Sequence, residues 1–314
     1  MSGMEDSIKM FIEQVLSEIA ITDSGKTDSG PAEEAGRTAC GLVEKEASVK
    51  AAQIIDSSDG ADFSAVDLQS QLLVPNPKNK DLYMDMKRST AARLGAWRAG
   101  SRPLTETLLR LRADHAVAQD SVLGEISEED AAKYKMVFVK SACRDKDEYL
   151  TKPDLGRVLN DESTKKLEKE CEKRPQVQIL AADGLSSRAV EANLPDLFPA
   201  LIQGLQSMGL KVGTPIMAGF ARVGLMDAIG EVLQPDVCVN LIGERPGLGT
   251  AESMSAYIVY NPRAGVIESE RTVISNIHKG GTPAVEAGAH IAALIKKILD
   301  AKASGVNLKI RGGD

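Results

Sequence analysis

Hydrophobic positions follow different patterns in three parts of the chain. Residues 6–20 place apolar side chains at helical spacing with charges opposite, which predicts a short amphipathic helix. Residues 21–65 carry few apolar side chains and are rich in Ser, Gly, Asp and Glu, as is typical of a flexible linker. Residues 1–75 are thus predicted to be an amphipathic helix plus a flexible linker. A tethered helix cannot bury its own stripe, so it must dock on this protein's body, a sister chain or a foreign surface. The helix either packs on this protein's own oligomer or addresses the protein to a larger assembly.

The second region, residues 76–170, is predicted to be a small helical domain rich in positive charge. Gly100 and Pro103 are expected to split it into two helices from about residue 85 onwards, because proline interrupts a helix. The charges either form a solvated face paired with acids or provide a surface for an acidic partner subunit. Trp97 lies beside the break, and tryptophan and arginine often anchor interfaces. The positive residues are Lys87, Arg88, Arg93, Arg98, Arg102, Arg110 and Arg112.

The third region, residues 171–314, alternates short apolar runs with helical patterns and has glycine at the ends of the runs. Such alternation predicts an α/β fold, a Rossmann-like parallel sheet with helices on both faces. The predicted strands are 177–183, 211–218, 235–243 and 255–262, and the predicted helices are 195–209, 225–234, a short one after residue 249, and 284–303.

Composition narrows the class of protein. The chain has 314 residues, a net charge of −7 and a pI of about 5.3, which argues against a nucleic-acid partner. Apolar runs are too short for a membrane-spanning helix, and the acidic N-terminus does not resemble a secretory signal. The cysteines are scattered without a CxxC pair, which is typical of reduced thiols in the cytoplasm. They are Cys40, Cys143, Cys171 and Cys238.

Candidate chemistry is expected where parallel strands end, because α/β sheets bind ligands there. Three polar segments stand out as candidates for such strand ends: 183–186, 243–249 and 275–283. In the second, Gly247 and Gly249 partly imitate a dinucleotide fingerprint, but its third glycine is replaced by Glu252. This loop either binds NAD or is a tight turn without a ligand. Adjacent opposite charges at Glu244 and Arg245 favour a ligand.

Other catalytic motifs are missing from the sequence. It has no GxSxG elbow, no HExxH pair and no P-loop, so we expect no catalytic residue on this chain. Of its three histidines, His278 in a glycine-rich turn is the best polar candidate, and a structural role in that turn is equally expected. Without His, Asp or Cys at ligand spacing, no metal site is expected.

Long motifs in a fixed order reveal a resemblance. They are RSTAARLGAWRAGSRPLTETLLRLRADHA, YLTKPDLGRVL, DGLSSRAV, GLKVGTP, GERPGLGTAESMSAYIVYNPR and RTVISNIHKGGTPAVEAG. Together they resemble the light chains of ethanolamine ammonia-lyase. The resemblance extends from about residue 85 to the C-terminus, whereas the segment before about residue 75 is variable in that family.

The resemblance implies a role in an adenosylcobalamin-dependent lyase that converts ethanolamine to acetaldehyde and ammonia by a radical mechanism. It implies a cobalamin site at the interface with a large catalytic subunit, in a dodecamer of six large and six small subunits. It also implies residence in a bacterial microcompartment, where residues 1–20 would address the enzyme to shell proteins. The alternatives are a freestanding NAD-binding oxidoreductase and a scaffold protein of the microcompartment.

The family's cobalamin contacts correspond to Val223, Glu244 and Val273 in this sequence. The family pattern has cysteine at the third position, so Val273 removes any thiol interaction and leaves a backbone or apolar contact. Because the chain has no DxHxxG motif, we expect cobalamin to keep its own lower base, with no cobalt ligand from this protein. The radical chemistry would belong to the cofactor, and this agrees with the missing catalytic motifs.

Overall fold

The computed structural model describes residues 67–312 except 69 and 91. These residues belong to one structural unit, Asp59–Asp314. The helix predicted for residues 6–20, the linker predicted for 21–65 and Cys40 lie outside the described residues.

Six strands form the central sheet, in the order β3-β5-β4-β6-β7-β8. The first four in this order run parallel, and β7 and β8 are antiparallel to their neighbours. The carboxyl ends of four strands therefore meet at one edge of the sheet. The strands are β3 (Val137–Lys140), β4 (Val177–Ala182), β5 (Ile216–Gly219), β6 (Val237–Gly243), β7 (Met254–Tyr260) and β8 (Thr272–Ile277).

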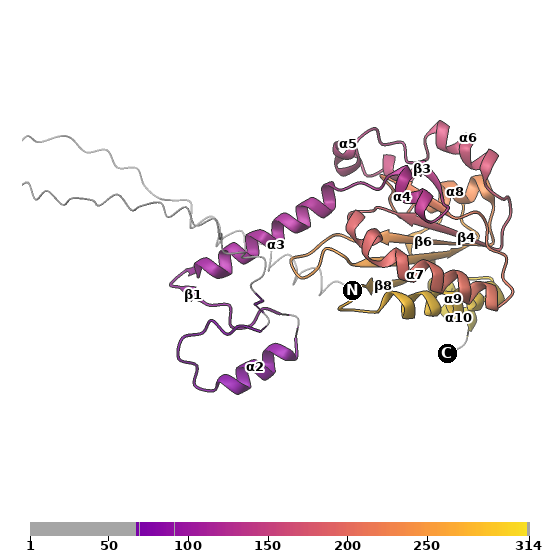
Figure 1. Ribbon diagram of the computed structural model, residues 1–314. Helices are drawn as coiled ribbons and strands as arrows, with labels where there is room; N and C mark the ends of the chain where they lie inside the picture. Colours follow the sequence, from indigo (N-terminus) through magenta and orange to yellow (C-terminus); the bar gives the residue numbers. More distant parts are fainter. Residues whose placement is uncertain (1–66, 69, 91, 313–314) are drawn as a thin grey trace, which may run out of the picture. The chain divides into compact units, whose positions relative to one another are not determined.

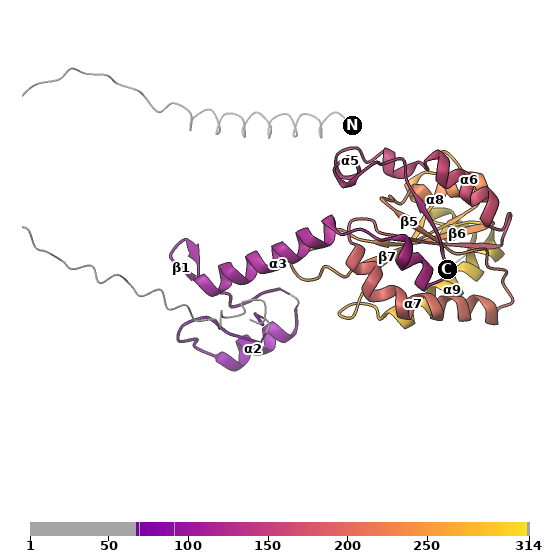
Figure 2. The same ribbon diagram turned by 45° about the horizontal axis from the view of Figure 1, so that its top comes forward.

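Helices cover both faces of the sheet, as Figure 1 and the turned view of Figure 2 show. Along β4 every residue is buried; Ile179 packs toward one face and Leu180 toward the other, because successive side chains alternate. Helix α9 approaches α7 closely at Gly288, where a Cβ would lie 2.7 Å from the Leu197 carbonyl oxygen. One face carries α7 (Ser187–Ser207) and α9 (Ala284–Ala301), and the other carries α6 (Asp161–Glu170) and α8 (Leu225–Leu233).

The predicted strands 177–183 and 235–243 contain β4 and β6, and the prediction 211–218 overlaps β5, which begins only at Ile216 and ends at Gly219. The α/β class is confirmed. Two predictions for the following segment are wrong. No helix lies between residue 249 and β7, and the strand expected at 255–262 is antiparallel. The loop returns the chain directly onto β6, with which β7 pairs over seven residues. An antiparallel pair needs only such a short connection, whereas a parallel one needs a crossover.

Helix α7 begins at Ser187 and not near residue 195, because the Ser186 hydroxyl caps it by accepting from the Ala189 backbone N–H. Pro195 and Pro199 lie inside this helix on its exposed side, where water can bind the carbonyls that they leave without a partner. The C-terminal helix is confirmed as α9, and α10 (Val306–Gly312) follows it.

Part of the range 76–170 belongs to the sheet, because β3 pairs with β5 along its whole length. Around β3 lie α4 (Glu128–Lys133), α5 (Lys146–Thr151), the 3-10 turn η2 (Leu155–Arg157) and α6. The carboxyl end of β3 therefore brings α5 and η2 to the same edge of the sheet as the loops after β4 and β5.

The prediction of the first of two helices after residue 85 is wrong. Helix α2 (Lys80–Arg88) ends early, and a hairpin of β1 (Arg98–Ala99) and β2 (Arg102–Pro103) precedes α3 (Thr105–Leu123). Gly100 takes a left-handed conformation, with φ of 62°, in the hairpin turn. The turn closes the chain back on itself and excludes a continuous helix.

Some of the positive charges expected on a surface are engaged inside this region. Lys87 is buried, and its ammonium donates to the carbonyl oxygens of Leu68 and Leu94. Arg93 and Arg110 both pair with Asp114 on α3. The exposed guanidinium groups that remain include those of Arg98, Arg102 and Arg112.

Candidate functional site

Glu244 and Val273, two of the expected cofactor residues, flank one side chain of β7. The backbone N–H of Glu244 donates to the Ser253 carbonyl, and its carboxylate accepts a hydrogen bond of 3.2 Å from the Tyr257 hydroxyl. Val273 is the register partner of Tyr257 on β8, so both side chains point to the same face of the sheet. That face is the one covered by α8, because Tyr257 packs against the hydrophobic cluster beneath α8.

Val223, the third expected residue, lies in the loop between β5 and α8 and packs against the same cluster. The structure therefore places all three expected residues on one face of the sheet. Val223 and Glu244 are half-buried, and Val273 is 45% exposed. Among the described residues, Tyr257 is the one side-chain partner of Glu244, and the second carboxylate oxygen has none.

The loop that carries Val223 is anchored on both sides. The Arg222 backbone N–H donates to the Gly156 carbonyl at 2.8 Å, and the Arg222 guanidinium lies 4.2 Å from the centre of the Tyr149 ring. On the other side, the stem of Arg157 packs on Gly224, where a Cβ would lie 3.2 Å from Arg157 Cγ. Turn η2 and Tyr149 of α5 therefore fix the position of Val223.

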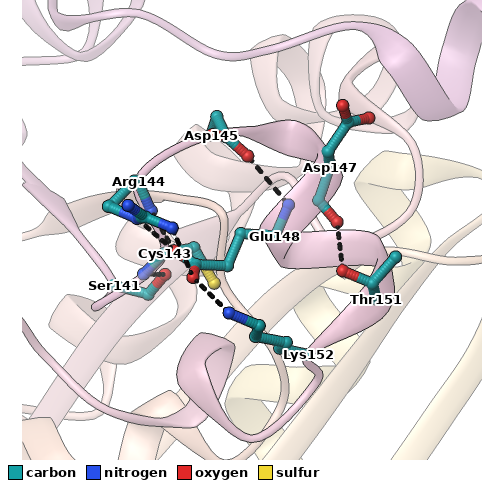
Figure 3. Close-up of polar contacts among 8 residues, drawn as sticks. All are labelled: Ser141, Cys143, Arg144, Asp145, Asp147, Glu148, Thr151 and Lys152. Carbon is teal, nitrogen blue, oxygen red and sulfur yellow. Dashed lines mark hydrogen bonds and ion pairs between the residues drawn. The ribbon is translucent and has the colours of Figure 1, made fainter.

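Helix α5 is held by a network of charged groups, which Figure 3 shows. Asp145 caps the helix by accepting from the Glu148 backbone N–H at 2.8 Å. The Glu148 carboxylate in turn accepts hydrogen bonds from Arg144 and from Lys152. These hydrogen bonds, those from Arg144 first, lower the pKa of Glu148 to about 2. The network fixes the orientation in which α5 directs its two inward side chains.

The two inward side chains of α5 are Lys146 and Tyr149, and they contact the loops that follow β4 and β5. Tyr149 is fully buried, and its hydroxyl donates to the Gly184 carbonyl oxygen at 2.6 Å. Asp183 is also fully buried and accepts hydrogen bonds from the backbone N–H groups of Phe220 and Ala221, at 2.8 and 2.9 Å. The Lys146 ammonium lies 4.0 Å from the Asp183 carboxylate. This cluster locks the carboxyl edge of the sheet beneath Val223.

Burial raises the pKa of Asp183 from 3.8 to about 6, although the Ala221 N–H and Lys146 act in the opposite direction. The native state therefore binds a proton more tightly than the unfolded state between these two values. We expect this group's contribution to the free energy of unfolding to fall as pH rises through that window. The free energy of unfolding would be measured by urea unfolding of the full chain at several pH values, for the wild type and for Asp183→Asn. An identical pH dependence in both proteins would contradict the prediction.

The arrangement does not fit the dinucleotide-binding alternative. The loops after β4 and β6 touch through their backbones: a Cβ on Gly184 would lie 2.1 Å from the Gly243 carbonyl oxygen. Ser186 also donates to the Ala251 carbonyl across the same junction. The crevice between these strands, where a dinucleotide would lie, is closed. The Gly247–Gly249 loop leads into β7, so no helix N-terminus follows it to receive a pyrophosphate.

His278 has a structural role in its turn. One ring nitrogen accepts from the Gly280 backbone N–H at 3.1 Å, and the other lies 2.8 Å from the Asn276 side-chain oxygen. Across residues 67–312, with the gaps at 69 and 91, no group of three His, Cys, Asp or Glu side chains could hold a metal ion. In the same described part, no helix is long and apolar enough to cross a membrane.

Comparison with known proteins gives consistent results. The family model described as ethanolamine ammonia-lyase light chain (EutC) matches residues 80–309. The ethanolamine ammonia-lyase small subunit of Clostridium perfringens is 50% identical over 305 residues, which cover 97% of this chain and 99% of that protein. The small subunit of Fusobacterium nucleatum is 51% identical over 306 residues, covering 98% of this chain and 99% of that protein. On this similarity over almost its whole length, the chain belongs to the ethanolamine ammonia-lyase light-chain family.

Proposed function

We propose that this chain is the small subunit of an adenosylcobalamin-dependent ethanolamine ammonia-lyase and that it completes the cofactor site at an interface with the large subunit. The similarity to proteins named as small subunits supports the assignment and implies a large partner. The complex would convert ethanolamine to acetaldehyde and ammonia. Bound adenosylcobalamin would supply the radical by homolysis of its cobalt–carbon bond.

The described residues fit such a cofactor. Corrin side chains are amides that donate hydrogen bonds, and the ring itself has a large apolar face. Glu244 offers a carboxylate oxygen that has no partner within the described part of the chain, and Val273 offers exposed apolar surface on the same face of the sheet. This combination of one acceptor with apolar contacts is the single observation that carries the proposal.

The chain's own residues would bind and orient the cofactor and exclude water from it. Glu244 would accept a hydrogen bond, and Val223 and Val273 would pack against apolar surface. None of them would transfer a proton or attack the substrate. In this proposal the sheet and its helices serve as a Rossmann-like cofactor domain, whose ligand contacts Glu244 after β6, Val223 after β5 and Val273 on β8.

The region before the sheet would meet the large subunit. Its hairpin exposes Trp97, and α3 exposes Leu123 to 59%. Exposed Arg98 adjoins Trp97 at the hairpin, and Arg112 is exposed on α3. Arginine and aromatic residues are enriched in protein interfaces. The proposed assembly has six large and six small subunits in a cytoplasmic microcompartment, with residues 1–20 directed to shell proteins.

Glu244→Ala is expected to weaken cobalamin binding to the heterocomplex by about 10- to 100-fold, because a hydrogen bond to a charged group contributes about 1.5–3 kcal/mol. The complex would be co-expressed, and its dissociation constant for cyanocobalamin measured by equilibrium dialysis. The rate of ethanolamine deamination at saturating adenosylcobalamin would then show whether the variant chain still assembles into an active enzyme.

Glu231→Ala is a matched control, because Glu231 is exposed on α8 and lies outside the proposed site. Its affinity for cobalamin should equal that of the wild type. Unchanged affinity in Glu244→Ala, with both chains assembled, would contradict the proposed cofactor contact. A scaffold protein would instead bind its partners and leave cobalamin affinity independent of this chain.

A further inference from the structure

Tyr257 is the side chain that links two of the proposed cofactor contacts. It is half-buried on β7, donates its hydroxyl hydrogen to Glu244 at 3.2 Å, and is the register partner of Val273 on β8. Because register partners share a face, its ring lies on the surface that carries both residues.

The hydroxyl remains a donor at neutral pH. Burial first, and then the negative charge of Glu244, raise the pKa of Tyr257 to about 12. A neutral phenol beside an ionised carboxylate forms a charge-assisted hydrogen bond. This bond holds one Glu244 oxygen and restricts the rotation of a side chain that is otherwise half-exposed to solvent.

The neighbouring polar groups do not replace Tyr257 in this role. Asn240, its register partner on β6, and Ser255 on β7 are both fully buried. Within the described residues, neither the Asn240 amide nor the Ser255 hydroxyl has a hydrogen-bond partner, so neither donates to Glu244. Tyr257 alone among these side chains extends from the sheet to the carboxylate.

The geometry points to Tyr257 as a positioning residue of the cofactor site: it orients the Glu244 carboxylate so that its second oxygen is presented to the ligand. This inference rests on the proposed function. Holding one oxygen on the protein pre-organises the other, which reduces the entropy lost when a ligand amide binds. Tyr257 also pairs with Val273 across the β7–β8 ladder, so one residue adjoins both proposed contacts.

Tyr257→Phe removes the hydroxyl and keeps the ring. We expect cyanocobalamin to bind the heterocomplex about 3- to 30-fold more weakly. Tyr260→Phe is the matched control: Tyr260 lies on the same strand, packs against the cluster on the other face, and has no hydroxyl hydrogen bond in the described part of the chain. The control should bind cobalamin as the wild type does, and both variants should retain the melting temperature within a few degrees.

A double-mutant cycle separates positioning from a general structural role. If Tyr257 acts through Glu244, then adding Tyr257→Phe to Glu244→Ala causes no further loss of affinity. An additive loss would overturn the inference, and so would unchanged affinity in Tyr257→Phe when Glu244→Ala binds weakly. If Glu244→Ala itself binds normally, it is the proposed function that fails. The dissociation constant and the coupling between the two sites are readouts that a change in folding alone would not reproduce.

Discussion

Asp183→Ala is expected to lower the free energy of unfolding by about 3–5 kcal/mol, one of the two largest effects that we predict. The carboxylate is fully buried and accepts hydrogen bonds from the backbone N–H groups of Phe220 and Ala221. Alanine would leave both donors buried without an acceptor and would leave the Lys146 ammonium, 4.0 Å away, without its counter-charge. Urea unfolding of the full chain, monitored by circular dichroism, measures the loss.

Asp196→Ala is the control, since Asp196 is an exposed acid on α7. Its effect should stay within about 0.5 kcal/mol of the wild type. A loss below about 1 kcal/mol in Asp183→Ala would show that water or another group replaces the carboxylate. The cluster would then not be what fixes the loop before Val223.

The sequence predicted the parallel core of the sheet because its strands are buried on both faces. Residues of β4 and β6 form mainly apolar runs, each with one polar residue, Gln178 and Asn240, and all of them are buried. The edge strands were less visible. β8 mixes exposed Val273 and Ser275 with buried Ile277, and β3 has only four residues. Protein covers only one face of such a strand, so its pattern of apolar and polar residues is too weak to distinguish it from a loop.

The candidate site was only partly predictable. Glu244 was found because it follows an apolar run and occupies a motif position of the family. Tyr257 and Tyr149 were not found, because their roles depend on partners that are distant in the sequence. Tyr149 donates to the carbonyl of Gly184, which is 35 positions away, and Tyr257 reaches Glu244 across 13 positions of a hairpin. The signal for the Tyr257–Glu244 pair would have been a tyrosine on one strand of a hairpin whose side chain points to the same face as an acidic residue at the end of the other strand.

Arg271→Met is expected to cost about 3–5 kcal/mol, because it breaks a buried ion pair by removing one partner. The Arg271 side chain is 2% exposed and contacts both carboxylate oxygens of Asp227 on α8, at 3.0 and 2.7 Å. Arg271 immediately precedes β8, so this pair fixes the strand of Val273 against the helix that follows Val223. Urea unfolding of the full chain would measure the loss.

The double variant Arg271→Met with Asp227→Leu should recover most of that loss, because apolar side chains of similar volume replace a buried pair at little cost. Glu268→Ala is the control: Glu268 also contacts Arg271, but its side chain is 68% exposed, so its removal should cost less than about 1 kcal/mol. A double variant as unstable as the sum of its single changes would show that the two residues do not act as a pair. The alignment of β8 with α8 would then depend on apolar packing, and the two valines of the proposed site would keep their places without the guanidinium.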